Sequence, residues 1–268
     1  MTCTFVLGIM STTTLSADIG ADCAAAVSAV NGKLEGSAGY IEDRDGDGAR
    51  FHGVASLAVP IGCLFGAQVD LGGGDLDGDS FFGAGGHLFI RDPESYLVGV
   101  QGQYIDLEGG DLFRIGPEME LYLDQVTVSG AIGFEGMDEL STGDFLGGIE
   151  ASYYITENLK IGAAYRHFLE VDAGAFTVEF QQEDKPVSVF ADVMAGSDDF
   201  ISVSGGIRFY FGGEDKSLIR RHREDDPPHS FNWLRKAATP RASCTDNPET
   251  PLFDECTGTD VAVSGSLD

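Results

Sequence analysis

Alternation of apolar and polar residues along short segments is the feature that most constrains how this chain can fold. From Ile201 to Phe211 the odd positions are apolar or glycine, while the even positions include Ser202, Ser204 and Arg208. Successive side chains of a β-strand point to opposite faces, so this pattern predicts a strand with one apolar and one polar face. Similar segments recur from residue 32 to residue 212. We therefore predict that this whole region is built of β-strands.

The number and spacing of these segments predict how the strands are connected. Most are about 9–11 residues long, the length of a tilted strand that crosses a bilayer. Connections after even-numbered segments are tight, whereas those after odd-numbered segments are mostly acidic and glycine-rich, as at 42–48, 72–79 and 135–143. These features predict an all-β fold, an antiparallel up-and-down transmembrane β-barrel of about 12 strands. The twelve segments lie near 33–41, 50–59, 63–71, 80–90, 95–105, 112–122, 125–135, 144–155, 159–170, 174–182, 187–195 and 200–211.

The residues on the polar face distinguish a membrane barrel from a soluble one. A soluble sandwich or lipocalin-like barrel also alternates, but its solvated face normally carries many lysines. Here the polar face holds glycine, serine, glutamine and isolated charges of both signs, and the apolar face is almost uncharged. We therefore expect lipid outside and a polar lumen inside. The predicted lumen charges are Arg114, Glu118, Glu120, Glu150, Lys160, Arg166, Glu179, Asp192 and Arg208.

Composition excludes several other classes. The 268 residues carry 16 Lys and Arg against 44 Asp and Glu, a net charge of −28, which argues against a general nucleic-acid-binding surface. A hydrophobic fraction of 43% excludes wholesale disorder. The sequence has no uninterrupted apolar run long enough for a transmembrane helix.

On these residues the chain resembles small bacterial outer-membrane β-barrel proteins. The segment Ile201–Phe211, with Phe209 and Phe211 at its end, is similar to the closing strand that the outer-membrane assembly machinery recognises. The resemblance covers about 32–212 and implies insertion in the outer membrane of a Gram-negative bacterium. It also implies membrane lipid and the assembly machinery as partners, and both termini in the periplasm. Typical members end at that aromatic residue, whereas this chain continues for another 57 residues.

The two ends of the chain are expected to differ from the barrel. Residues 1–17 resemble a signal peptide without its basic start, and 18–31 are expected to be a periplasmic segment. Residues 213–268 are expected to form a separate, mostly irregular periplasmic tail. This tail has a basic cluster at 216–223 that would contact anionic groups of the inner leaflet or cell wall, or else be part of a solvated linker.

Cysteine positions predict disulfides and no metal centre. Removal of residues 1–17 leaves four cysteines, which we expect to pair as Cys244 with Cys256 and Cys23 with Cys63. The sequence contains no CxxC motif and no Cys/His cluster, so a zinc site has no support.

Two acidic segments are candidates for weak calcium or magnesium sites, because alternate carboxylates around a glycine turn suit a hard cation. Neither places a glutamate at the twelfth position of an EF-hand, so solvated turns are the simpler interpretation. His52, His87 and His167 lack a recognisable nucleophile–base motif, and we expect no enzyme activity and no cofactor. The candidate ligands are Asp43, Asp45 and Asp47 in one segment, and Asp75, Asp77 and Asp79 in the other.

The lumen charges allow two interpretations. Paired charges could close the barrel as a salt-bridged network, or they could line a narrow channel and set its selectivity. Twelve strands enclose more space than the eight-stranded size that side chains fill. The first hypothesis is therefore a narrow porin-like channel for ions or small polar solutes. The alternative is a closed structural or surface-interaction barrel without transport activity.

Overall fold

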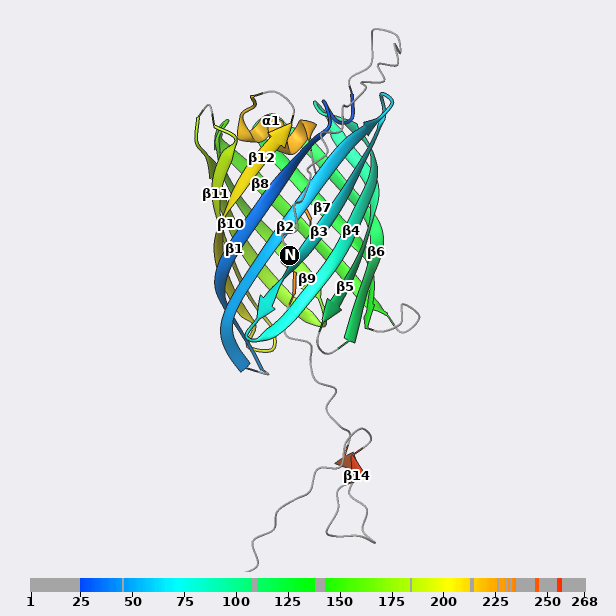
Figure 1. Cartoon of the computed structure of the whole chain (residues 1–268), viewed down its shortest axis with the longest axis vertical. Coiled ribbons are helices and arrows are strands. Elements are labelled where there is room, and N and C mark those ends of the chain that lie inside the picture. Colours follow the sequence, from blue (N-terminus) through cyan, green and yellow to red (C-terminus); the bar gives the residue numbers. More distant parts are fainter. Residues whose placement is uncertain are drawn as a thin grey trace, which may run out of the picture.

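The fold is a closed antiparallel barrel of twelve strands, in which each strand pairs with its neighbours in sequence and the last pairs with the first (Figure 1). The computed structural model describes residues 25–44, 46–107, 110–137, 143–183, 185–212, 215–225, 227–229, 231 and 233–234, and the backbone of 244–245 and 255–256. The signal peptide prediction, Cys23 and Asp45 therefore lie outside the described residues.

All twelve predicted strands are present, which confirms the fold class. They are β1 (Asn31–Asp43), β2 (Gly46–Ile61), β3 (Phe65–Leu76), β4 (Asp79–Asp92), β5 (Tyr96–Leu107), β6 (Gly110–Leu123), β7 (Val126–Met137), β8 (Asp144–Thr156), β9 (Leu159–Phe168), β10 (Val171–Gln181), β11 (Val187–Gly196) and β12 (Ile201–Gly212). A two-residue pair, β13 (Cys244–Thr245) with β14 (Glu255–Cys256), and one helix, α1 (Leu218–Glu224), follow them.

The apolar face of each strand points outward, as the alternation predicted. Phe134 and Phe209 are 62% and 52% exposed, whereas Glu179 and Arg50 are each 1% exposed. A soluble protein buries the apolar face and exposes the charged one. The distribution here is the reverse, and a belt of exposed aliphatic and aromatic side chains surrounds the barrel. Lipid outside and a polar interior are therefore the arrangement that this surface fits.

The strands reach further than the sequence predicted, and two of the acidic loops are largely strand. Residues 42–43 and 46–48 form the paired ends of β1 and β2, and residues 72–76 and 79 those of β3 and β4. Asp77 and Gly78 have φ of 57° and 95°, as both central residues of a type I′ turn require. Two turn residues are thus enough to close this hairpin. The acidic residues of these two segments therefore lie at strand ends whose outward face is hydrophilic. They do not belong to long loops.

The barrel has two distinct ends. The turn end carries the connections after even-numbered strands, the start of β1 and the end of β12, and the loop end carries the other connections. Helix α1 lies at the turn end (Figure 1). Among the described residues, no helix is long and apolar enough to cross a membrane.

The chain after β12 differs from the expected separate periplasmic tail. Its described residues before 235, which are 215–225, 227–229, 231 and 233–234, pack against the barrel and contact lumen-facing residues. Alternation could not reveal this, because the segment is not a strand. Residues 25–30 were also expected outside the barrel, yet Ala26 and Val27 are buried against Phe89, Leu97 and Tyr122 inside the turn end.

Candidate channel lumen and its plug

Helix α1 is docked at the turn end by hydrogen bonds to the connection between β8 and β9. The backbone N–H of Leu218 donates to Asn158 Oδ1 at 3.0 Å, and that of Ile219 donates to the Glu157 carbonyl at 3.0 Å. Gln181 Nε2 donates to the Lys216 carbonyl at 2.6 Å. Leu218 is fully buried against Tyr154 and Tyr210. The helix therefore covers the opening of the lumen as a packed element of the fold.

Asp225, just after α1, links the segment before β1 and the segment around α1 to the barrel wall. Its carboxylate accepts from Lys216 Nζ at 2.6 Å and from Ser28 Oγ at 2.8 Å. Its carbonyl accepts from Arg91 Nη1 at 3.0 Å. Ser28 belongs to the N-terminal segment and Arg91 to β4, so one residue connects three parts of the structure.

Most of the basic cluster at 216–223 is occupied by contacts within the protein. The buried Arg221 side chain donates to Gln181 Oε1 at 3.1 Å and stacks 4.8 Å from the Tyr210 ring. Arg223 donates to the Val126 carbonyl at 2.9 Å. Arg220 is the most exposed of these side chains and pairs with Glu224 at 2.7 Å. These cations hold the helix in place, whereas the sequence allowed either a contact with anionic groups or a solvated linker.

The described residues 227–229, 231 and 233–234, which we name the plug segment, follow the helix and lie in the lumen. Gln68 Nε2, near the start of β3, donates to the Pro227 carbonyl at 3.1 Å. His229 Nε2 lies 3.3 Å from Glu35 Oε2 on β1. Phe231, further along, is fully buried against Gly72 and Gly83. The segment therefore advances away from the turn end as it runs.

Trp233 and its backbone contact the opposite side of the wall. Its ring lies over Gly148, where an added Cβ would come within 2.6 Å of Trp233 Cη2. The Arg166 guanidinium stands 5.4 Å from the ring centroid, and Arg114 Nη2 donates to the Trp233 carbonyl at 2.8 Å. Two of the predicted lumen arginines thus bind the plug segment.

The loop end of the lumen is apolar, which the prediction of a polar lumen did not include. Phe231 and Leu234 belong to a buried cluster. Its wall members lie on the strands near the loop-end connections. These inward side chains form a cap across the lumen that the plug segment completes. The wall members include Leu76, Leu107, Leu112, Phe168, Val171 and Phe200.

Every predicted lumen charge points inward, and each has a partner among the described residues. Arg114 pairs with Glu135 at 2.9 Å, Lys160 with Glu150 at 3.4 Å, and Arg166 with Asp192 at 3.3 Å. Glu118 pairs with His87 at 2.9 Å, and Glu120 accepts from the Tyr122 hydroxyl at 2.8 Å. Arg208 joins Glu35 at 2.6 Å and also contacts Glu179. The charges form several separate clusters around the plug segment.

Several lumen residues were missed by the sequence analysis. His87, interpreted there as an ordinary strand residue, lies in the lumen between Glu118 and Asp70, 3.1 Å from the Asp70 carboxylate. Glu35 contacts both His52 and Arg208. The parity of their strands places them on the inner face, so the alternation itself could have identified them. The other missed lumen residues are Lys33, Arg50, Gln68 and Arg91.

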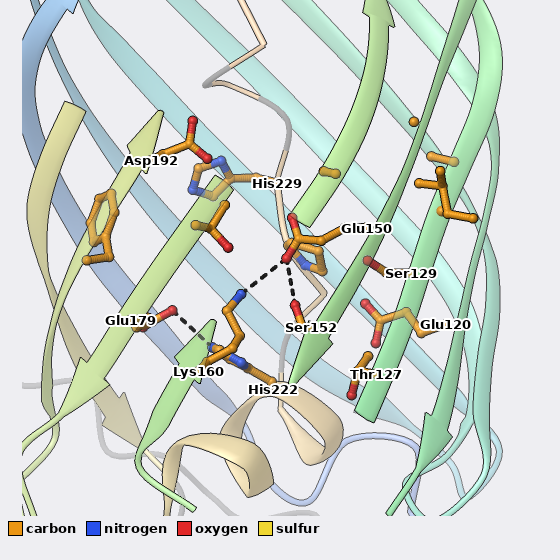
Figure 2. A pocket seen from close by; sticks show the side chains of 18 of the residues that line it. Glu120, Thr127, Ser129, Glu150, Ser152, Lys160, Glu179, Asp192, His222 and His229 are labelled. Carbon is orange, nitrogen blue, oxygen red and sulfur yellow. Dashed lines mark hydrogen bonds and ion pairs between the residues drawn. The ribbon is translucent and has the colours of Figure 1, made fainter. Parts of the chain in front are cut away.

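A cavity of about 170 Å³ remains in the lumen between the wall and the plug segment (Figure 2). Its lining includes carboxylates, lysine and histidine, with Glu150 linked to Lys160 and Ser152, and Glu179 facing His222. The volume is close to that of an engineered cavity that holds one benzene-sized molecule. Around this cavity the described residues of the plug segment and the paired wall charges obstruct the lumen.

Two groups of α1 have shifted pKa values. Burial, partly offset by Glu179, lowers the pKa of His222. Its Nδ1 lies 2.8 Å from the Tyr154 hydroxyl. For Glu224, burial alone would raise the pKa, but hydrogen bonds from Arg220 and Lys216 outweigh it and lower the pKa. The docked helix thus favours a neutral imidazole and an ionised Glu224.

The acidic segments and cysteines give less information. Among the described residues no group of three or more His, Cys, Asp or Glu side chains is placed to hold a metal ion. Asp75 accepts from the Gly78 N–H at 2.7 Å, and Asp47 from the Tyr40 hydroxyl at 3.0 Å. Cys244 and Cys256 are opposite each other in the β13–β14 pair, and the Ala26 N–H donates to the Cys63 carbonyl. Both disulfide pairings stay predictions.

The closed barrel with an apolar exterior defines an outer-membrane β-barrel protein, which agrees with the resemblance noted in the sequence. No protein-family model and no curated protein sequence matches the chain. Among solved structures, it is similar to the KdgM porin, with 7% identity, 67% of this chain and 99% of that chain covered, and a TM-score of 0.52. The KdgM porin in complex with disordered oligogalacturonate gives 8% identity, the same coverage and a TM-score of 0.52. Omp33 of Acinetobacter baumannii gives 13% identity over 68% of this chain and 98% of that chain, with a TM-score of 0.47. At such identities the likeness shows the fold alone.

Proposed function

We propose that this protein is a porin-like channel for ions or small polar solutes whose lumen is obstructed by its own C-terminal plug segment. The observation that carries the proposal is the origin of the obstruction. The described residues of the plug segment, which follows the barrel in the chain, occupy the centre of the lumen together with side chains of the wall. Removing or displacing this segment leaves all twelve strands and their pairing in place.

The wall around the plug segment supports a polar path. Inward-facing glycines at 72, 83 and 148 leave recesses that the plug side chains occupy. Between them stand charges of both signs, including Glu150, Lys160 and Arg208. Opposed charges along a narrow lumen discriminate among ions and polar solutes. A twelve-stranded barrel also encloses more space than its own side chains fill.

The exposed apolar belt supports the proposed location in the outer membrane of a Gram-negative bacterium, with lipid and the assembly machinery as partners. The KdgM porin, which has a similar fold, is a porin by its own description. We propose a channel function for this chain as well, without a catalytic role.

Conductance in planar lipid bilayers tests the proposal. We compare the full chain with a variant that ends after Gly213 and therefore lacks α1 and the plug segment. The matched control ends after Ala242, which removes the end of the chain but keeps the described plug segment. We expect the full chain and the control to conduct rarely, and the shorter variant to give frequent, larger current steps.

Folding of each variant is checked by its change in mobility on a denaturing gel after boiling, since a folded barrel has all its backbone hydrogen bonds closed on themselves. If the variant that ends after Gly213 is folded and still does not conduct, the channel proposal is wrong. The protein would then be a closed barrel.

A further inference from the structure

We propose that the chain beyond Leu234 leaves the lumen at the loop end, so that residues 235–268 lie on the external face of the outer membrane. This proposal depends on the path of the plug segment and on the orientation of the barrel. It does not require the lumen to conduct.

The first step is the direction in which the plug segment runs. Helix α1 is hydrogen-bonded to the β8–β9 connection at the turn end. Pro227 then contacts Gln68 near the start of β3, Phe231 lies over Gly72 in the middle of that strand, and Leu234 joins the cap with Leu76 at its end. The segment therefore passes through the lumen from one end to the other.

The second step is that a return of the chain through the lumen would meet side chains that are already packed against the plug segment. The remaining cavity of about 170 Å³ suits one small molecule. A returning chain of many residues would have to pass the apolar cap and the charge clusters, both of which are packed against the plug segment. We therefore infer that residue 235 continues outward from the loop end.

The third step is the orientation of the barrel in the membrane. At the turn end the exposed apolar belt reaches the last strand residues, such as Ile61, Leu123 and Phe211. At the loop end the outward residues change from apolar to acidic. In outer-membrane barrels the periplasmic side has short turns and the longer side is extracellular. The connections at both ends of this barrel are mostly short, so the extension of the strands past the apolar belt is what distinguishes its loop end. The loop end therefore fits the exterior.

Three tyrosines mark this change from apolar to acidic. Tyr40, Tyr104 and Tyr165 are exposed on the outer wall, and each hydroxyl donates to a carboxylate seven residues later in the same hairpin. The pairs occur on alternate hairpins, β1–β2, β5–β6 and β9–β10. Amphipathic tyrosines are enriched at the membrane–water interface. The strand ends beyond them, with Asp47, Asp111 and Asp172, then lie outside the lipid. None of these tyrosines or aspartates belongs to the plug segment.

Epitope tags on intact cells test the proposal. One tag follows Asp268, a second is inserted in the 138–142 connection at the loop end, and a third at Asp124 in the turn end. We expect antibody to label the first two on intact cells and the third only after permeabilisation. Trypsin added outside should remove the C-terminal tag, because Arg235, Lys236 and Arg241 follow the plug segment.

Two results would overturn the proposal. If the 138–142 tag is labelled on intact cells while the C-terminal tag needs permeabilisation, the chain does not emerge at the loop end. If the tag at Asp124 is labelled instead, the assumed orientation is reversed. Neither result bears on conductance, so failure of this inference and failure of the channel proposal are distinguishable.

Discussion

Adding one methyl group at either glycine beneath the plug segment should release it. A Cβ at Gly72 would lie 2.9 Å from Phe231 Cδ1, and a Cβ at Gly148 would lie 2.6 Å from Trp233 Cη2. At both positions the three nearest atoms all belong to the plug side chain. In the substitutions Gly72→Ala and Gly148→Ala the closest contacts of the new Cβ are therefore with the docked plug segment.

The size of the effect follows from the cost of overpacking. Phe231 is fully buried, so its ring cannot move aside without disturbing the cap. Inserting a methylene or methyl group in such a site costs about 1–3 kcal/mol. Since only the docked state carries this strain, the ratio of released to docked segment should rise about 5- to 150-fold.

Single-channel recording measures this ratio as open probability. The matched control is Gly85→Ala on the inner face of β4, where an added Cβ would meet only ordinary contacts, 3.5 Å from the Gly102 carbonyl oxygen and 3.7 Å from Asp70 Cβ. We expect the control to open as rarely as the unchanged chain. In a background that already contains Phe231→Ala, Gly72→Ala should add little, because the clash partner is gone.

The reasoning is refuted if Gly72→Ala and Gly148→Ala open no more often than Gly85→Ala while all three remain heat-modifiable on gels. The glycines would then serve strand curvature and not the docking of the plug segment.

Three further outcomes are expected. Arg114→Ala leaves the buried Glu135 carboxylate and the Trp233 carbonyl without this donor, so the barrel should lose about 3–5 kcal/mol of stability in denaturant titration and open more often. Because the pKa of His222 is lowered on docking, docking is strongest above its ordinary pKa of about 6.5 and weakens as pH falls below it. Open probability should therefore rise between about pH 7.5 and pH 5.5 and lose this dependence in His222→Gln, whereas a flat profile in the unchanged chain would contradict the docking role. In the variant that ends after Gly213, Lys160→Glu should shift the reversal potential in a salt gradient toward cation selectivity, and an unchanged potential would place Lys160 away from the ion path.

The barrel could be predicted from the sequence because alternation has a direct physical meaning in a strand. Once Phe209 is assigned outward, Arg208 must point inward, and the same parity places Arg114, Glu150 and Asp192 in the lumen. Strand ends were less predictable. Acidic residues and glycine are typical both of loops and of strands that project from the membrane into water. The composition of 42–48 and 72–79 therefore cannot distinguish a loop from a strand end.

The plug segment could not be predicted for a different reason. Its recesses on the wall are glycines, which carry no side chain to signal a partner, and two of its hydrogen bonds use the backbone carbonyls of Pro227 and Trp233. The aromatic residues Phe231 and Trp233 in a tail rich in proline and basic residues were the available signal. Without the barrel geometry, nothing in the sequence relates them to Gly72 or Gly148.

The way in which the plug segment is held suits release without unfolding. The twelve strands close on one another, so the sheet offers no free edge with which an inner segment could pair. The segment is held by side chains on glycine recesses and by hydrogen bonds such as those from Gln68 and Arg114. Hydrogen bonds of this kind contribute about 0.5–3 kcal/mol each, and their loss leaves every strand pair intact. A barrier inserted as a strand, or built from wall side chains, could not leave in this way. The same contacts that close the lumen therefore make reversible opening physically possible.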